Sequence, residues 1–406
     1  MTEPDSPATP RRAALVFVFV TVVLDMLALG MIVPVLPKLV ESFMGGDTAR
    51  AAEVYGLFGT LWALMQFLFS PVLGTLSDRW GRRPVILLSN LGLGLDYILM
   101  ALAPSIAWLL VGRVISGITS ASFSTASAYI ADVAPPEKRA AGFGMLSAAF
   151  GLGFVVGPAL GGVLGSIGPR LPFWVAAGLS LVNWTYGLFV LPESLPPERR
   201  ADFAWRRANP AGSLGLLGSH PELLGLASVH FVTNVAHEAL PTTFVLYAGY
   251  RYAWDARAVG LAIAGIGVCS AVVGGALVQP VVTRFGERRV LLAGLLFGVA
   301  GFAIYGLAST GAAFCAGVPL TALWGLHGPA MQGLMTRRVP PSAQGQLQGA
   351  LSSLRGIAFM VGPGLFTLTF ARFMQSDWHL PGAPFLLAGL LLAGATLLAW
   401  RATRAR

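Results

Sequence analysis

The chain has 406 residues, of which 55% are hydrophobic and 11% are charged, and its formal net charge is +9. So little polar surface cannot cover a water-soluble globule, so the composition predicts an integral membrane protein. The basic residues lie in short clusters between apolar stretches and not along one face, which argues against nucleic-acid binding. Cys269 and Cys315 fall in apolar stretches without CxxC or Cys/His spacing, so neither a disulfide framework nor a metal site is expected.

The apolar stretches are regularly spaced along the chain. Residues 1–12 are polar and proline-bearing without a small-residue cleavage site, which is typical of a cytoplasmic tail and not of a removable signal peptide. Each later stretch has roughly the 20 residues that a hydrocarbon core of about 30 Å demands. Twelve transmembrane helices are predicted, at about 13–36, 54–76, 85–103, 105–131, 140–165, 171–192, 222–248, 258–283, 289–308, 312–335, 345–370 and 382–400.

Loop charges predict the orientation. If both termini are cytoplasmic, most of the 27 lysines and arginines fall on the cytoplasmic side. Cytoplasmic loops carry this excess of basic residues, so both termini are expected in the cytoplasm. Arg113 and Arg355 fall within spans instead.

Three acidic residues, Asp25, Asp96 and Glu238, also fall inside spans. An acid in the bilayer costs several kcal/mol and is retained mostly where it faces a cavity or a partner, so all three are functional candidates. Asp25 is expected to take up a proton from one side and release it on the other. The alternatives are a structural pair between Asp25 and Arg113 and, for Asp96, a hydrogen bond between helices.

The span 105–131 carries a polar stripe of Arg113 and four serines at helical spacing. Small residues also let helices pack closely, so only Arg113 is a strong candidate, as a group that modulates the proton affinity of a nearby acid.

The span 222–248 is the most polar one. Glu238 shares one broad helical face with four further residues, which would be untenable against lipid, so this face is expected to line a cavity or to pack on other helices. A zinc peptidase is excluded because HExxH would need a histidine where Pro241 stands. The other residues of the face are His230, Asn234, His237 and Pro241.

The spans 312–335 and 345–370 complete the predicted cavity. His327 and Gln332 are candidate substrate contacts, although a lone histidine is as often a packing residue. Arg355 shares a stripe with Gln348 and Ser352, and a guanidinium there needs a partner. Glu238 and an anionic substrate group are the two candidates, and Glu238 is favoured.

The chain repeats itself with an offset of 205 residues. RWGRR at 79–83 returns as RFGER at 284–288, and GMLSAAFGLGFVVGP at 144–158 returns as GALSSLRGIAFMVGP at 349–363. Two six-helix halves related by a pseudo-two-fold axis are therefore expected, with a substrate cavity between them near the membrane midplane and alternating access by rocking. The predicted division is an N-terminal bundle at 1–192, a cytoplasmic linker at 193–221 and a C-terminal bundle at 222–406.

Several motifs together resemble the tetracycline efflux antiporters of the major facilitator superfamily. GTLSDRWGRRP at 74–84 matches the superfamily's loop between helices 2 and 3, and GPALGG at 157–162 is an antiporter mark. The further matches are LDMLALGMIVPVLP (24–37), LDYILMA (95–101), GRVISGITSAS (112–122), YIAD (129–132), LPTTFVLYAGYRYAW (240–254) and QGQLQGAL (344–351). The resemblance implies the major facilitator fold and proton-driven export of a hydrophobic drug across a bacterial inner membrane.

The resemblance also assigns roles to residues. Asp96 matches an acidic position used for drug passage, and Arg113 resembles a proton-linked arginine. Asp78 is expected to pair with a neighbouring arginine and to accept from a helix start in the other half, bracing the outward-facing state, although the loop charges alone also serve topology. The predicted gating residues are Asp78, Arg79, Arg82, Arg83, Asp132, Gly157 and Pro158.

The chain departs from the family pattern in its second half. Gly298 stands where the family carries an aspartate, and Ser270 stands where some members have a histidine. Glu238 is therefore expected to share proton coupling with Asp25, Asp96 and Arg113. The sequence predicts a monomeric exporter of tetracycline or a related compound, without a cofactor beyond the proton gradient, the substrate travelling as a magnesium complex or not. The alternative is a proton-linked exporter or importer of an amphiphilic or anionic metabolite; nothing predicts an enzyme.

Overall fold

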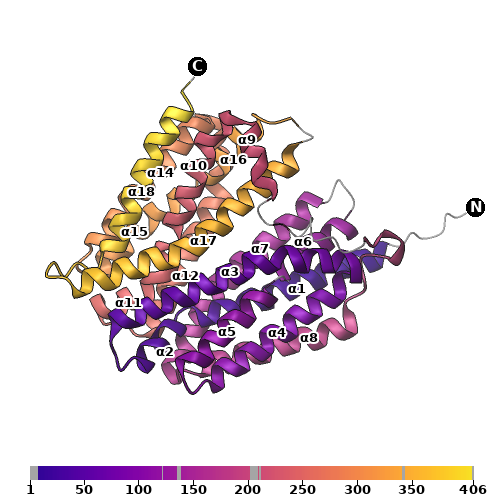
Figure 1. Ribbon diagram of the computed structural model, residues 1–406, viewed down its shortest axis with the longest axis horizontal. Helices are drawn as coiled ribbons and strands as arrows, with labels where there is room; N and C mark the ends of the chain where they lie inside the picture. Colours follow the sequence, from indigo (N-terminus) through magenta and orange to yellow (C-terminus); the bar gives the residue numbers. More distant parts are fainter. Residues whose placement is uncertain are drawn as a thin grey trace, which may run out of the picture.

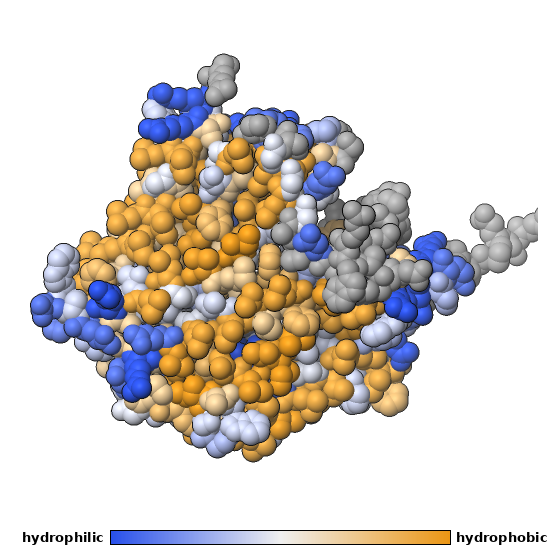
Figure 2. All heavy atoms as spheres, viewed as in Figure 1, coloured by the Kyte–Doolittle hydropathy of each residue, from blue (hydrophilic) through white to orange (hydrophobic). Residues whose placement is uncertain are grey.

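The computed structural model describes residues 8–120, 122–134, 139–201, 209, 212–340 and 343–404, and all regular elements within these ranges are helical. Figure 1 shows the helices in two groups, one from each half of the chain. Hydrophobic side chains cover most of the outer surface of both groups in Figure 2, while hydrophilic ones gather at the ends. This distribution is that of a multi-pass membrane protein.

The first group is called here the N-terminal bundle. Its longest helices are α3 and α7, and each continues through one internal proline, Pro71 in α3 and Pro158 in α7. The helices of this bundle are α1 (Ala8–Ile32), α2 (Leu36–Phe43), α3 (Thr48–Trp80), α4 (Arg82–Leu102), α5 (Ile106–Thr119), α6 (Ser122–Val133), α7 (Arg139–Ile167) and α8 (Leu171–Val190).

The second group is called the C-terminal bundle. A short π-helical turn, Val273–Leu277, joins α12 to α13 within one continuous span. The helices are α9 (Gly215–Ser219), α10 (Pro221–His237), α11 (Ala239–Tyr252), α12 (Ala256–Val272), α13 (Val278–Phe285), α14 (Glu287–Leu307), α15 (Gly311–Trp324), α16 (His327–Thr336), α17 (Gln344–Gln375) and α18 (Ala383–Ala402).

Nine helices of the described residues are long and apolar enough to cross a membrane. The other three predicted spans, 105–131, 222–248 and 312–335, are each divided into two shorter helices. A proline explains two of the breaks, because it has no N–H and its ring clashes with the carbonyl four residues earlier. Pro241 leaves the carbonyl of His237 without its helical hydrogen bond, and Pro329 does the same to the carbonyl of Gly325. The architecture is therefore the predicted all-helical one, with three interrupted membrane segments.

The two bundles touch through glycines where α7 meets α12. A Cβ atom on Gly260 would lie 2.2 Å from the carbonyl oxygen of Pro158, and one on Gly162 would lie 2.4 Å from that of Ala256. Helices approach this closely only where side chains are missing. α3 and α17 meet similarly, since Thr60 Oγ1 donates to the carbonyl of Met360 at 3.1 Å.

These contacts lie on one side of the protein. They involve the first half of α3 and α12 and the second half of α7 and α17, and they extend to the middle of α3 and α17, where Phe67 meets Gly356. In Figure 1 the ribbons meet near α2 and α11 and diverge toward the chain ends. The bundles are thus in contact at the end remote from the termini.

Candidate functional site

Glu238 sits at the break between α10 and α11. Because Pro241 cannot donate to the carbonyl of His237, the helix is interrupted where the acid stands. The Glu238 side chain packs on Gly362 of α17, where an added Cβ atom would lie 2.5 Å from both its Cβ and Cγ. Gly362 therefore creates the space that holds this half-buried side chain.

Arg355 lies on α17 with its side chain exposed. Its guanidinium carbon is 5.0 Å from the centre of the Phe359 ring, a cation–π distance. Arg355 interacts electrostatically with Glu238 and with both His230 and His237. Among the described residues it makes no ion pair, so the favoured Glu238 partnership is a longer-range attraction and not a salt bridge.

The break between α15 and α16 lies next to the break at Glu238. His327, the first residue of α16, stacks on Trp324 with ring centroids 5.1 Å apart and planes 7° apart. Its Nδ1 hydrogen-bonds the carbonyl oxygen of Trp324 at 2.7 Å. His237 lies on the other helix with its ring 5.7 Å from that of Trp324. Two interrupted helices thus bring two histidines together around one indole.

The remaining predicted cavity residues lie along α10, α16 and α17. His230 Nε2 is 3.2 Å from the carbonyl oxygen of Leu351, and Asn234 donates to the carbonyl of His230 at 2.8 Å. Ser352 is exposed, and so is Gln332, which hydrogen-bonds Gln348 at 3.4 Å. The structure therefore places His230 and Asn234 against each other on α10, and Gln332 of α16 against Gln348 of α17.

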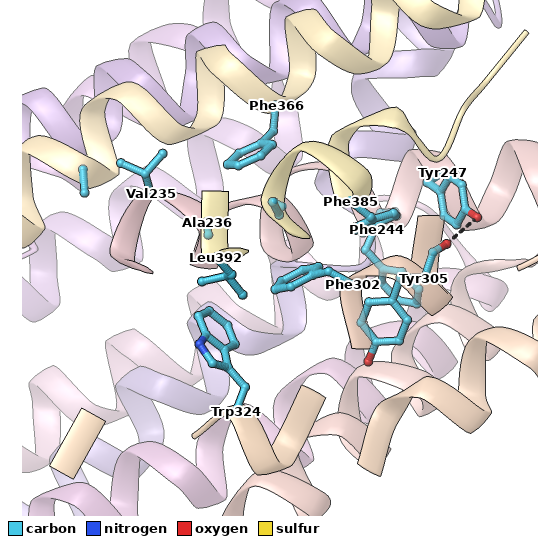
Figure 3. Close-up of a cluster of buried hydrophobic side chains, with 14 of the residues drawn as sticks. Val235, Ala236, Phe244, Tyr247, Phe302, Tyr305, Trp324, Phe366, Phe385 and Leu392 are labelled. Carbon is cyan, nitrogen blue, oxygen red and sulfur yellow. Dashed lines mark hydrogen bonds between the residues drawn. The ribbon is translucent and has the colours of Figure 1, made fainter. Parts of the chain in front are cut away.

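Gly298, in the middle of α14, has no room for an acidic side chain. It is buried, and an added Cβ atom would lie 2.8 Å from Trp324 Cδ1 and 2.7 Å from Leu392 Cδ1. Trp324 and Leu392 lie side by side at the edge of the aromatic cluster in Figure 3, beside Phe302. The indole thus fills the space that a side chain at position 298 would need.

Asp25 and Asp96 are placed differently from the C-terminal set. Asp25, 3% exposed, accepts a hydrogen bond from Asn183 Nδ2 at 3.0 Å. Asp96, 0% exposed, forms an ion pair with Arg113 at 3.7 Å. Both carboxylates are buried within the N-terminal bundle, and neither is exposed to a substrate in this conformation.

Tyr55 of α3 lies near both sets of charges. Arg113 of its own bundle and Glu238 of the other are both within electrostatic range of its side chain. Neither Tyr55 nor Asn183 was among the residues that the sequence singled out. Asn183 carried a usable signal, because it is an amide in the apolar span 171–192, whereas tyrosine at position 55 begins a span, where it is unremarkable.

The predicted gating charges form a network at the end of the N-terminal bundle that carries the termini. Arg82 pairs with Asp78 at 2.6 Å and with Asp132 at 3.0 Å. Glu193 accepts from the backbone N–H groups of Arg82 and Arg83 at 2.8 and 3.3 Å, and so caps the start of α4. Arg79 is exposed, and within the described residues the ion pairs of this network all lie inside one bundle.

The C-terminal bundle repeats part of this network with the charges exchanged. Glu287 and Arg337, which follow Arg82 and Asp132 by 205 residues, form an ion pair at 3.1 Å. Acid and base have changed places at these two positions, whereas Arg79 and Arg83 return as Arg284 and Arg288, so the loops are basic at those positions in both halves.

The family model for the Major Facilitator Superfamily matches residues 18–363. The chain belongs to the major facilitator superfamily. It is 38% identical to the class C tetracycline resistance protein of Escherichia coli, over 90% of this chain and 91% of that protein, and 35% identical to the class B protein, over 86% and 87%. Within the superfamily it therefore belongs to the family of the tetracycline resistance proteins, and it is a transporter and not an enzyme.

Solved structures agree with this assignment. The human organic anion transporter MFSD10 (TETRAN) is 26% identical and has a TM-score of 0.70, with 97% of this chain and all of that chain covered. A bacterial homologue of the lysosomal transporter Spinster shares the fold, with a TM-score of 0.78, 18% identity and 98% of each chain covered. In this transporter, two crevices lie at the far end of α17, around Leu368 and Arg372, away from the predicted cavity residues.

Proposed function

We propose that this transporter is a proton-coupled antiporter that exports a hydrophobic, drug-like molecule, tetracycline or a related compound, by alternating access. The names of its relatives support tetracycline as the first compound to test. The proposal rests mainly on one structural observation, which is that each bundle holds an intramembrane acid within the electrostatic range of an arginine. These are Asp96 with Arg113 and Glu238 with Arg355.

An acid beside an arginine suits proton exchange. While it is ionised, the arginine stabilises its charge, and when it is protonated, the same arginine becomes free to bind another anion. Tyr55 lies within electrostatic range of both sites, which places them near the same part of the interface between the bundles. We assign proton coupling to Asp25, Asp96, Glu238 and Arg113, and substrate contact to the eight residues of the C-terminal bundle described above.

Alternating access would work by opening and closing the two ends of the molecule in turn. The bundles are in contact at the end remote from the termini, through Pro158 with Gly260 and Ala256 with Gly162. In the opposite state, the networks around Arg82 and Glu287 would approach each other. Arg82 and Glu287, and likewise Asp132 and Arg337, have opposite charges, so attraction between these residues of the two loops would stabilise closure there.

The setting of the protein belongs to the same proposal. We place it as a monomer in a bacterial inner membrane with both termini in the cytoplasm, as most of its basic loop residues favour. The cytoplasmic linker between the two bundles falls within residues 193–221, of which α9 (Gly215–Ser219) packs with α10 and α17 of the C-terminal bundle. The proton gradient is the energy source, and magnesium enters only as a companion of the substrate.

The test uses inside-out vesicles with an acidic lumen. In these vesicles the cytoplasmic face of the transporter is outside, so export appears as uptake into the lumen. Labelled tetracycline with Mg²⁺ is added, and luminal pH and label are followed together. The proposal predicts accumulation of label with a rise in luminal pH, both abolished by a protonophore. Accumulation that persists after the gradient is collapsed would overturn proton coupling.

A further inference from the structure

The charges that this transporter presents between its bundles are unbalanced. Arg355 is exposed, whereas Asp25 and Asp96 are 3% and 0% exposed and are engaged with Asn183 and Arg113. Glu238 is half-buried in the notch at Gly362. The accessible charge on this side of α17 is therefore positive.

The position of Arg355 excludes a purely topological role. It lies 11 residues after the start of α17 at Gln344, which is about 17 Å along the helix axis and near its middle. An arginine at that depth is retained where it meets a cavity or a partner. Within the described residues it has only the Phe359 ring beneath it and no carboxylate in ion-pair contact.

Two groups near Arg355 can donate hydrogen bonds to the same ligand. His237 is exposed on α10 and close enough to the guanidinium to interact with its charge, whereas His230, about two turns earlier on the same helix, is engaged with the carbonyl oxygen of Leu351. The Trp324 indole is 7% exposed, and its Nε1–H has no acceptor among the described residues. In Figure 3 this nitrogen lies on the side of the ring turned away from Phe302. A cluster with these donors fits an oxygen-rich anion.

A carboxylate of the protein cannot fill this role at position 298. Gly298 is closed off by Trp324 and Leu392, so an acidic side chain has no room at this position. α14 therefore presents no acid beside Trp324 that could attract a cationic metal complex. The chemistry that remains is recognition of negative charge.

We propose that Arg355, with His237 beside it, binds an anionic oxygen of the substrate, a carboxylate or an acidic enolate. This inference rests on the proposed export function and narrows it. The substrate class is an amphiphile that carries an acidic group free of metal, so tetracycline itself is carried as its metal-free enolate and not as a magnesium complex. Glu238 then competes with the substrate for the arginine, which couples substrate binding to the protonation of one residue.

The experiment uses the full-length protein in the inside-out vesicles and two comparisons. The first is tetracycline with excess Mg²⁺ against tetracycline with EDTA. The second is an aryl-alkyl carboxylic acid against its methyl ester, which differs only in charge and one methyl group. We expect EDTA to preserve or increase the tetracycline response, and the acid but not the ester to raise luminal pH.

Variants locate the effect. Arg355→Gln is expected to raise the KM for the acid at least about tenfold, as loss of a charged hydrogen bond does, with Arg355→Lys intermediate. Arg372→Gln is the matched control, because it removes an arginine from the far end of the same helix. The wild-type acid and ester comparison needs no variant, so it decides the question even if Arg355→Gln folds poorly.

The outcomes separate the two proposals. A response that requires Mg²⁺, or equal responses to acid and ester, would overturn the anion site while leaving proton-coupled export in place. An unchanged KM for the acid in Arg355→Gln would also overturn it. Silence with every compound would overturn the export function and the anion site together.

Discussion

Gly298 lies directly against the indole of Trp324. A Cβ atom added at Gly298 would be 2.8 Å from Cδ1 and 2.9 Å from Cγ of that ring, closer than van der Waals contact allows. The space that an acidic side chain would occupy in α14 is filled by an aromatic ring of α15. The acid that lies within a membrane span of the C-terminal bundle is instead Glu238, which stands at a helix break and faces Gly362.

The first prediction concerns this contact. Gly298→Ala should lower the free energy of unfolding by about 1–3 kcal/mol, because overpacking a closed contact forces the ring or the helix to move. Gly394→Ala in α18 is the control, since nothing lies within 4 Å of the added atom, and the higher helix propensity of alanine should make it neutral or stabilising. Thermal unfolding in detergent measures both. Equal midpoints for the two variants would contradict the packing.

The second prediction concerns Glu238. Glu238→Gln keeps the size of the side chain but cannot carry a proton at physiological pH. Accumulation driven by a proton gradient should fall at least about tenfold, while movement of substrate down its own gradient persists. The control is Glu222→Gln in the first turn of the same helix, where the side chain is exposed. Unchanged pH dependence of accumulation in Glu238→Gln would remove Glu238 from proton coupling.

The third prediction concerns Asp25 and its neighbour Asn183. Asn183→Leu removes a buried donor at 3.0 Å from the Asp25 carboxylate, and the expected loss of stability is about 1–3 kcal/mol. Thr185→Val on α8 is the control, because the Thr185 hydroxyl is exposed and bonds only its own helix at Leu181. A double-mutant cycle with Asp25→Asn measures the coupling directly. Additive effects would mean that the two side chains do not interact.

The fourth prediction compares the two repeat-related ion pairs. Arg82 is 11% exposed at the side chain and bonds Asp78 and Asp132, whereas Arg337 is 77% exposed. Arg82→Ala should therefore lower the unfolding midpoint clearly. Arg337→Ala should cost no more than about 1 kcal/mol, because water screens an exposed pair. If Arg337→Ala is the more damaging of the two, the burial assigned to these pairs is wrong.

Much of the fold was predictable because it rests on local patterns. Twelve apolar stretches, basic loops and the repeat are visible along the chain, and the pairing of Asp78 with a nearby arginine is a contact between neighbours in sequence. The internal breaks were not foreseen as breaks. Pro241 and Pro329 indicate two of these breaks, but both prolines lie within long apolar stretches that resemble continuous spans.

Only part of the site was predictable from the sequence: its polar residues on one helix, but not their burial or their contacts with other helices. The polar face of α10 pointed to His237 and Glu238, because lipid does not tolerate such a face. The burial of Asp25 and Asp96 depends on how each helix is rotated against its neighbours, which spacing within one helix does not determine. The contact of Gly298 with Trp324 joins two separate spans, and the missing acid therefore had no visible cause in the sequence.

The central claim is that binding of the substrate at Arg355 is coupled to the protonation of Glu238. The most direct measurement is proton release from the purified protein in weakly buffered detergent solution when a saturating substrate, found with the vesicle panel, is added. The account predicts release by the wild-type protein and its loss in Glu238→Gln, with binding followed in parallel by intrinsic tryptophan fluorescence. Saturable binding by the wild-type protein without any proton release would contradict the account.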